Sequence, residues 1–416
     1  MTAVTTVLGK LGRSAGTGRK PAEAGRAGAA AGPKARAVGR AGTAERAHNS
    51  TYLVLLVVVG VLCTAGLVMV LSASAVASLR AYGTPWSFFE RQVLYLVLGV
   101  GAFFVALRAS MARWQRLARP LAVLSALALM AVLVAGRSAG GASRWLGRGP
   151  VQFQPSELAK LALVLFAADV LARREGRRDW TYRSLPVILT TLVFVALIMK
   201  QPDMGTAVVI SCIAAAVLFT AGMPVRAMSS LGAVGGALAL VLAMTARYRA
   251  ARLTSFINPF AHANSTGYQS AQGLIALGAG HWTGAGLGQS LASWGYLPNQ
   301  YTDFIFAVIG QEAGFMGSLV VVGLFVALAL VGTRVALSAG TTFESLVAAG
   351  VTAWLSAQAV INIGAVADVL PVTGVPLPFV SYGGTSLVIV LFATGLLANI
   401  ARHAPGRSGA ATAARA

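Results

Sequence analysis

Long apolar runs separated by short polar segments dominate this chain. No Asp, Glu, Lys or Arg occurs between Arg46 and Arg80, Asp203 and Arg226, Arg226 and Arg247, Glu312 and Arg334, Glu344 and Asp368, or Asp368 and Arg402. Shorter apolar spans follow Arg91, Arg119 and Arg183, and another covers Leu158–Ala172. A membrane-spanning helix needs roughly 20 mostly apolar residues. The pattern therefore predicts an all-α polytopic membrane protein with about ten transmembrane helices.

The composition supports this fold class. Hydrophobic residues make up 56% of the 416 residues and charged residues only 11%, which excludes an ordinary soluble domain. Residues 1–50 are different, because they hold nine Lys or Arg and almost no large apolar side chains. Such a segment cannot bury a core, so we expect a disordered basic tail. The net charge of +21 does not indicate a nucleic-acid partner, since no aromatic interleaving or binding motif accompanies it.

The basic residues also predict the topology. Arginines gather in the second and fourth loops and near both ends of the chain. Under the positive-inside rule, these loops and both termini are cytoplasmic. We expect a transmembrane domain over residues 51–402 and a cytoplasmic C-terminal tail over 403–416. The outer face then carries the segments 137–155, 200–203 and 368–378, and a large loop of about residues 247–302 between helices seven and eight.

Asp303 is the most informative single residue. It lies where the polar segment Tyr296–Thr302 changes into a long apolar run, in a chain with only twelve acidic residues. An ionisable group at a membrane boundary is a candidate functional site because its desolvation is costly. The alternative is a helix N-cap that satisfies free backbone N–H groups. Position alone does not separate these two interpretations.

A second polar group begins the fourth predicted helix, in the sequence Gln154-Pro155-Ser156-Glu157 followed by Lys160. Glu157 and Lys160 are three residues apart and therefore share one helix face. They form either a local ion pair that makes insertion tolerable or a polar floor under an outward-facing cavity. In the next outer turn, Asp203 is expected to cap the sixth helix.

Two further segments are rich in glycine or proline. The run Gly278–Gly288 resembles a phosphate-binding loop only weakly, because no Gly-Lys-Ser/Thr follows, and a flexible loop is the favoured interpretation. The segment Leu370–Ser386 interrupts an apolar span with three prolines and three glycines. Backbone groups freed at membrane depth need protein or water partners. A broken or re-entrant segment that lines a cavity is therefore predicted there.

Together these motifs resemble the SEDS family (shape, elongation, division and sporulation), which includes FtsW, RodA and SpoVE. The matching segments are spread across the membrane region: Phe153–Lys160, Pro202–Thr206, Gly267–Gln272, Gly284–Gly288, Leu297–Phe306 and Leu370–Ser386. The segments Val70–Ser74 and Pro85–Gln92 favour the FtsW branch. Two departures occur, at Asn299–Tyr301 and at Gln311 and Ala313, where the family usually has other residues.

The resemblance implies a glycosyltransferase of the bacterial plasma membrane that polymerises lipid II on the outer face. It also implies work beside a class B penicillin-binding protein transpeptidase and other division proteins. Asp303 matches the family's essential aspartate, and Glu157 and Lys160 match its polar pair. The other candidate substrate-binding residues are Arg144, Gln154, Ser156, Thr302, Ser381 and Gly383. No cofactor is certain, and since no metal-ligand cluster is evident, a divalent cation, magnesium or manganese, stays open.

The predicted chemistry uses Asp303 as the general base for the GlcNAc 4-hydroxyl of the acceptor. Inversion at the donor's anomeric carbon needs one in-line displacement and one base. Lys160 and Arg144 are candidates for holding the departing diphosphate, with Arg247, Arg249 and Arg252 as weaker ones. The alternatives are a lipid II flippase and a non-catalytic division scaffold. Flipping predicts polar residues throughout the membrane depth, whereas Asp169 and Arg173 are interpreted as a local pair at the inner helix end.

Overall fold

The computed structural model describes residues 33–139, 142–148, 151–177, 179–245 and 255–403. Its long helices are α1 (Pro33–Tyr82), α2 (Ser87–Arg108), α3 (Met111–Ala135), α4 (Pro155–Arg173), α5 (Trp180–Met199), α6 (Met204–Thr220), α7 (Val225–Thr245), α10 (Ile305–Ser338), α11 (Thr342–Val366) and α12 (Gly384–His403). Between α7 and α10 lie the short helix α9 (Tyr268–Ala279) and the 3-10 turns η1 (Phe260–His262) and η2 (Leu291–Trp294). The mainly helical class predicted from the sequence is confirmed.

Seven of the described helices are long and apolar enough to cross a membrane: α1, α2, α3, α5, α10, α11 and α12. The 17-residue α6 is apolar but shorter, and α4 carries four ionisable residues within its 19. The seven spans establish the polytopic class, while the count of ten stays a prediction.

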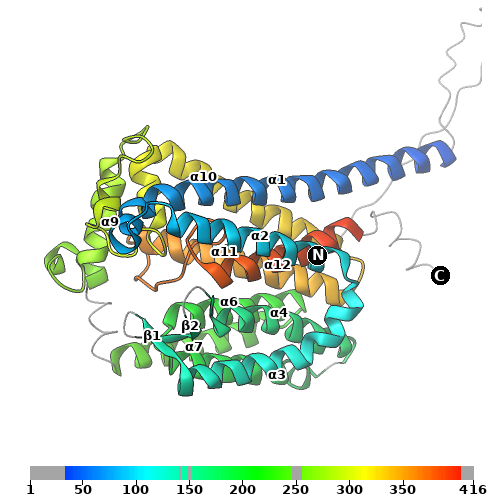
Figure 1. The fold of residues 1–416 in the computed structure, drawn as a ribbon. Helices are drawn as coiled ribbons and strands as arrows, with labels where there is room; N and C mark the ends of the chain where they lie inside the picture. The colour runs from blue at the N-terminus through cyan, green and yellow to red at the C-terminus, as the bar shows by residue number, and fades with distance from the viewer. Residues whose placement is uncertain (1–32, 140–141, 149–150, 178, 246–254, 404–416) are drawn as a thin grey trace, which may run out of the picture.

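The N-terminal segment differs from the sequence prediction. Helix α1 begins at Pro33, so residues 33–50, which we assigned to the disordered tail, are helical. Ala, Arg and Lys are good helix formers, and they dominate this part of the sequence. Figure 1 shows these first turns extending beyond the bundle. Residues 1–32 and 404–416, the remainder of the two predicted tails, lie outside the described residues.

A small antiparallel sheet departs from a strictly all-α fold. Strands β1 (Arg137–Ala139), β2 (Ala142–Arg148) and β3 (Val151–Phe153) pair in the order β1-β2-β3. Arg137 pairs with Trp145, and Leu146 pairs with Phe153. Mutual pairing of the strands between α3 and α4 satisfies their backbone groups. The sheet positions Arg144 at the end of the bundle.

Helices α11 and α12 lie at the centre of the fold. In their most apolar 18-residue windows, 67% and 78% of the residues are buried, against 28% for α2, α3 and α5. The less buried helices expose apolar side chains such as Leu94, Val97 and Leu127, as expected for surfaces facing lipid. Residues on α11 and α12 are therefore held by protein on most sides.

The polar connections fall at two opposite ends of the bundle. Figure 1 shows α9 and the strands at one end, and the segments 200–203, 255–304 and 367–383 connect helices at the same end; we call this the site end. At the opposite end, Asp169 accepts hydrogen bonds from Gln115 and from Arg119 and Arg173. The predicted local pair of Asp169 and Arg173 is thus confirmed and includes Arg119.

Candidate active site

Asp303 lies in a tight turn that precedes α10. Asn299 adopts a left-handed conformation with φ of +55°, and its carbonyl accepts hydrogen bonds from the backbone N–H groups of Thr302 and Phe304. The Thr302 hydroxyl donates to Asp303 Oδ1 over 2.9 Å. Phe304 occupies the N-cap position of α10, and it makes no side-chain cap hydrogen bond. The N-cap position thus falls on Phe304, and the Asp303 carboxylate accepts the Thr302 hydroxyl.

Asn362 on α11 fixes the backbone at Asp303. Its Nδ2 donates to the carbonyl oxygen of Asp303 over 2.7 Å and to that of Val375 over 2.8 Å. The Asn362 side chain is buried, so both bonds are shielded from water. One amide thereby joins the Asp303 turn to the non-helical segment 367–383.

Arg144 faces the same point from strand β2. Its Nη2 donates to the carbonyl of Pro202 over 2.9 Å, and its Nε lies 3.7 Å from Asp203 Oδ2. Gly374 lies close to both Arg144 and Asp303, because a Cβ built on it would lie 3.7 Å from Asp303 Oδ2 and 3.9 Å from Arg144 Nη1. With no side chain at residue 374, the space beside its Cα has room for a methyl group and borders both the carboxylate and the guanidinium; we call this space the gap at Gly374.

The predicted pair of Glu157 and Lys160 forms a buried network. Lys160 Nζ donates to Glu157 Oε1 over 2.8 Å and to Gln358 Oε1 over 2.9 Å. Both partners of the ion pair are 1% exposed. Ser386 donates to Glu157 Oε2, and Trp354 Nε1 donates to Gln358 Oε1. Glu157 and Lys160 therefore form the ion pair that both interpretations include, and in this conformation the Lys160 ammonium is held inside the protein.

Gln358 connects this network to the segment that carries Gly374. Its Nε2 donates to the carbonyl of Pro376 over 2.8 Å, beside the Val375 carbonyl held by Asn362. Gln358 and Asn362 are four residues apart and therefore lie on one face of α11. This face, together with Trp354, links the buried ion pair to the Asp303 turn.

Residues 375–381 of the non-helical segment 367–383 are mostly buried, as the predicted break requires, whereas Val369 is 70% exposed. Leu377, Phe379 and Val380 are buried. Ser381 Oγ accepts from the Leu377 N–H over 2.8 Å, and the Tyr382 N–H donates to the carbonyl of Tyr301. Its freed backbone groups therefore have the partners that an apolar environment demands.

The remaining predicted residues occupy neighbouring positions. Ser381 is engaged within its own turn, and Gly383 precedes α12. Gln154 donates from its backbone to Thr385 Oγ1 over 3.3 Å and from its side chain to Ser156 Oγ over 3.1 Å. Of the predicted set, Arg144 and Thr302 lie beside Asp303, whereas the others support the surrounding segments.

The glycine run Gly278–Gly288 donates backbone hydrogen bonds to carbonyls of α10. The N–H groups of Ala285 and Gly286 donate to the carbonyls of Gln311 and Glu312 over 2.9 and 3.0 Å. At this point α10 is kinked, with Gly314 at φ of +69°. The kink leaves carbonyls that the run satisfies, so the run is docked on α10, and its flexibility stays a prediction.

Asp203 caps α6, as predicted. It accepts from the Thr206 N–H over 3.2 Å and from the Thr206 hydroxyl over 2.9 Å. Arg247, Arg249 and Arg252 lie outside the described residues. Within the described ranges, no group of three His, Cys, Asp or Glu side chains is placed to hold a metal ion.

Sequence reasoning missed Gln358 and Asn362. The available signal was two amides at i and i+4 in an otherwise apolar helix, where each buried polar group needs a partner. Only the folded chain reveals those partners, because Lys160, Pro376 and Asp303 come from three other segments.

Comparison with known proteins then decides the family. Residues 52–405 match the FtsW/RodA/SpoVE family, described as "Cell cycle protein". The chain belongs to this family. It is 40% identical over 370 residues to the Mycobacterium tuberculosis "Probable peptidoglycan glycosyltransferase FtsW", covering 88% of this chain and 70% of the relative. It is 37% identical over 359 residues to Bacillus subtilis "Stage V sporulation protein E", covering 85% and 98%. These relatives make it FtsW-like.

Solved structures agree with this assignment. Thermus thermophilus rod shape determining protein RodA matches with a TM-score of 0.63 and 32% identity, covering 84% of this chain and 96% of RodA. A chain from a peptidoglycan synthase complex, studied for how polymerization and crosslinking are coordinated, matches with a TM-score of 0.69 at 32% identity. That match covers 84% of this FtsW-like chain and 96% of the other.

Proposed function

We propose that this FtsW-like protein is a peptidoglycan glycosyltransferase that polymerises lipid II, with Asp303 as its general base. The observation that carries the proposal is the arrangement around Gly374. A carboxylate oriented by Thr302 and a guanidinium held by Pro202 face the same gap. Curated relatives at 40% identity are described as peptidoglycan glycosyltransferases, and the chain covers most of their length.

The reaction needs one base and a stabilised leaving group. Asp303 would accept the proton of the acceptor's GlcNAc 4-hydroxyl as that oxygen attacks the anomeric carbon of the growing donor. The bond from this carbon to the undecaprenyl diphosphate breaks in the same displacement, which inverts the configuration. A single carboxylate suffices, because no covalent glycosyl intermediate is formed on the protein.

Arg144 is the better placed candidate for the departing diphosphate. Its side chain is 22% exposed and its Nη1 borders the gap at Gly374. Arginine binds phosphate through parallel N–H donors, and fixed positive charge stabilises the developing anion. Lys160, by contrast, is bound to Glu157 and Gln358, so we assign it the role of holding α4 and α11 together.

The charge distribution supports an outer-face site. Arginines concentrate at the end of the bundle opposite the site end, on the termini and connections of α2, α3, α4, α5 and α7. The positive-inside rule places that end in the cytoplasm of a bacterial cell and the site end outside. Lipid II would then be used after it has crossed the plasma membrane, during division or other wall synthesis. We further propose a class B penicillin-binding protein transpeptidase as the partner, as the resemblance to a synthase complex suggests.

The test is glycan-strand formation from purified lipid II, with a candidate transpeptidase present. Asp303→Asn should lower the rate by about 10²-fold or more, the usual cost of losing a general base. Asp179→Asn is the matched control, because Asp179 caps α5 at the opposite end through Thr181 and Tyr182. It should polymerise like the wild type.

Other outcomes would redirect the assignment. Equal rates for wild type and Asp303→Asn would remove Asp303 as the base. A folded complex that makes no polymer in any form would favour the flippase alternative, which a lipid II translocation assay in vesicles would then examine.

A further inference from the structure

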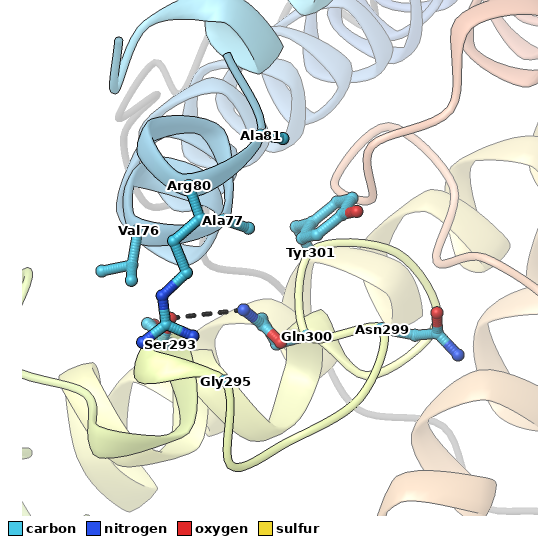
Figure 2. A pocket seen from close by; sticks show the side chains of 9 residues that line it. All are labelled: Val76, Ala77, Arg80, Ala81, Ser293, Gly295, Asn299, Gln300 and Tyr301. Carbon is cyan, nitrogen blue, oxygen red and sulfur yellow. Dashed lines mark hydrogen bonds between the residues drawn. The ribbon is translucent and has the colours of Figure 1, made fainter. Parts of the chain in front are cut away.

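A cavity of about 390 Å³ lies between the last turns of α1 and the loop that leads to Asp303. Its wall on the α1 side includes Val76, Ala77 and Arg80, and its opposite wall includes Ser293, Gly295 and residues 299–301. Ligand pockets in proteins start at roughly 300 Å³, so this volume admits a headgroup-sized ligand. Figure 2 shows Arg80 reaching from α1 across the cavity to Ser293.

Arg80 brings an uncompensated positive charge to this cavity. It is exposed and forms no hydrogen bond or ion pair with the described residues, unlike Arg144 or Arg119. Its Nη1 would lie 2.9 Å from a Cβ built on Gly295, which has φ of +101°. Glycine at 295 therefore lets the guanidinium lie against the loop backbone. A cation in this position attracts an anion.

Buried polar groups without full partners accompany the charge. Ser293 is 4% exposed, and its hydroxyl has no hydrogen-bond partner among the described residues. Gln300 is 5% exposed and donates only to the Ser293 carbonyl, over 3.3 Å. A buried hydroxyl without a partner costs free energy, so such a group points to a ligand or ordered water.

Aromatic side chains around the cavity indicate its depth in the membrane. Tyr82, Trp86, Trp294 and Tyr296 are 47%, 51%, 55% and 61% exposed. Exposed Trp and Tyr gather at the level of lipid headgroups, where the ring is apolar and its edge is wet. The cavity thus opens where lipid phosphates lie.

We propose that this cavity binds the phosphate group of a membrane lipid, with Arg80 as its cation and Ser293 as a hydroxyl donor. The phosphate belongs either to an anionic phospholipid or to an isoprenoid diphosphate. The site is separate from the gap at Gly374, although residues 299–301 share a turn with Asp303. It does not depend on the proposed function, because it requires only a membrane protein with this cavity.

The test measures lipid binding by native mass spectrometry of the full chain released from nanodiscs. The discs contain either phosphatidylglycerol or a neutral lipid with added undecaprenyl diphosphate. Arg80→Gln should weaken retention of at least one of these lipids by roughly 10-fold, the cost of losing a charge-assisted hydrogen bond. Ser293→Ala should weaken it less. Arg334→Gln, an exposed arginine on α10 at the opposite end, removes the same charge and should have no effect.

The two lipid arms identify the source of the phosphate. Weaker binding of undecaprenyl diphosphate alone assigns the site to the isoprenoid lipid, and weaker binding of phosphatidylglycerol assigns it to phospholipid. Equal retention of both lipids by Arg80→Gln and wild type would overturn the proposal. Phosphatidylglycerol is neither substrate nor product of the proposed polymerase, so its retention reports on this site alone, and a failure of polymerase activity and a failure of this site remain distinguishable.

Discussion

The side-chain amide of Asn362 holds the backbone of Asp303, donating to its carbonyl over 2.7 Å while also donating to Val375 over 2.8 Å. Asn399 makes the same arrangement elsewhere, since its Nδ2 donates to the carbonyls of Ala106 and Ala109 over 2.9 and 2.7 Å. Both side chains are buried. Asn362 and Asn399 therefore each join two backbone carbonyls, and of these two residues only Asn362 contacts the candidate active site.

Replacing Asn362 by Ala should reduce both stability and turnover. Two buried carbonyls lose a donor, at about 1–3 kcal/mol each. The Asp303 turn loses its anchor, and a displacement of 1 Å at a reacting group typically costs on the order of 10²-fold in rate. Thermal unfolding in detergent and polymerisation per folded protein are the two measurements.

Asn399→Ala is the control for this prediction. It should lower stability by a similar amount and leave the rate per folded molecule unchanged. If both variants slow polymerisation equally, Asn362 has no special role in positioning Asp303, and general destabilisation explains the loss.

The buried pair of Glu157 and Lys160 predicts strong energetic coupling. Lys160→Met leaves the Glu157 carboxylate buried without its cation, and Glu157→Gln leaves Lys160 without its anion. Removing one partner of a buried pair typically costs about 3–5 kcal/mol. The double variant removes both charges, so it should be clearly more stable than the sum of the single effects predicts. Additive losses in a thermal-unfolding cycle would argue against a coupled pair.

Adding a side chain at Gly374 tests whether the gap beside Asp303 and Arg144 holds substrate. Gly374→Ala adds a methyl group 3.7 Å from the carboxylate and 3.9 Å from the guanidinium, at ordinary contact distance. The methyl group fills the space where reacting atoms would lie, so we expect a rate at least about 10-fold lower. A left-handed φ of +71° adds a strain of about 1 kcal/mol.

Gly176→Ala is the control that separates the effect of backbone strain from the effect of filling the gap at Gly374. Gly176 has φ of +81°, and nothing lies within 4 Å of a Cβ built on it. It should show the same modest loss of stability with normal polymerisation. A Gly374→Ala variant that polymerises as fast as Gly176→Ala would mean that the gap does not hold substrate.

The sequence predicted the membrane class and the segments that meet at the site end, because charge-free runs and polar interruptions are local properties. Three of its candidate residues, Arg144, Thr302 and Asp303, lie together at the site end, and their roles stay predictions. It did not predict Asn362 or Gln358, whose roles depend on carbonyls from the distant segment 367–383. Nor did it predict the docking of the glycine run, since the kink at Gly314 that demands it appears only in the folded helix.

Asp368 predicts a pH dependence of stability at the site end. Its Oδ1 is buried without a hydrogen-bond partner among the described residues, and desolvation by burial raises the pKa of this carboxyl above its ordinary value of 3.8. The folded state therefore favours the protonated form. The ionised form is destabilising, and this effect develops as the pH rises from 3.8 through the folded-state pKa.

Asp368→Asn should remove this pH-dependent loss of folding stability. Asn tolerates the left-handed φ of +55° as well as Asp does, so the backbone is not strained by the change. The variant and wild type should have similar melting temperatures below pH 3.8, and the variant should become the more stable one as the pH rises through the folded-state pKa of Asp368, above which the difference stays constant. A difference that shrinks with rising pH would mean that the ionised carboxylate gains a favourable partner in the folded protein. The measurement is thermal unfolding of both proteins in the same detergent across this pH range.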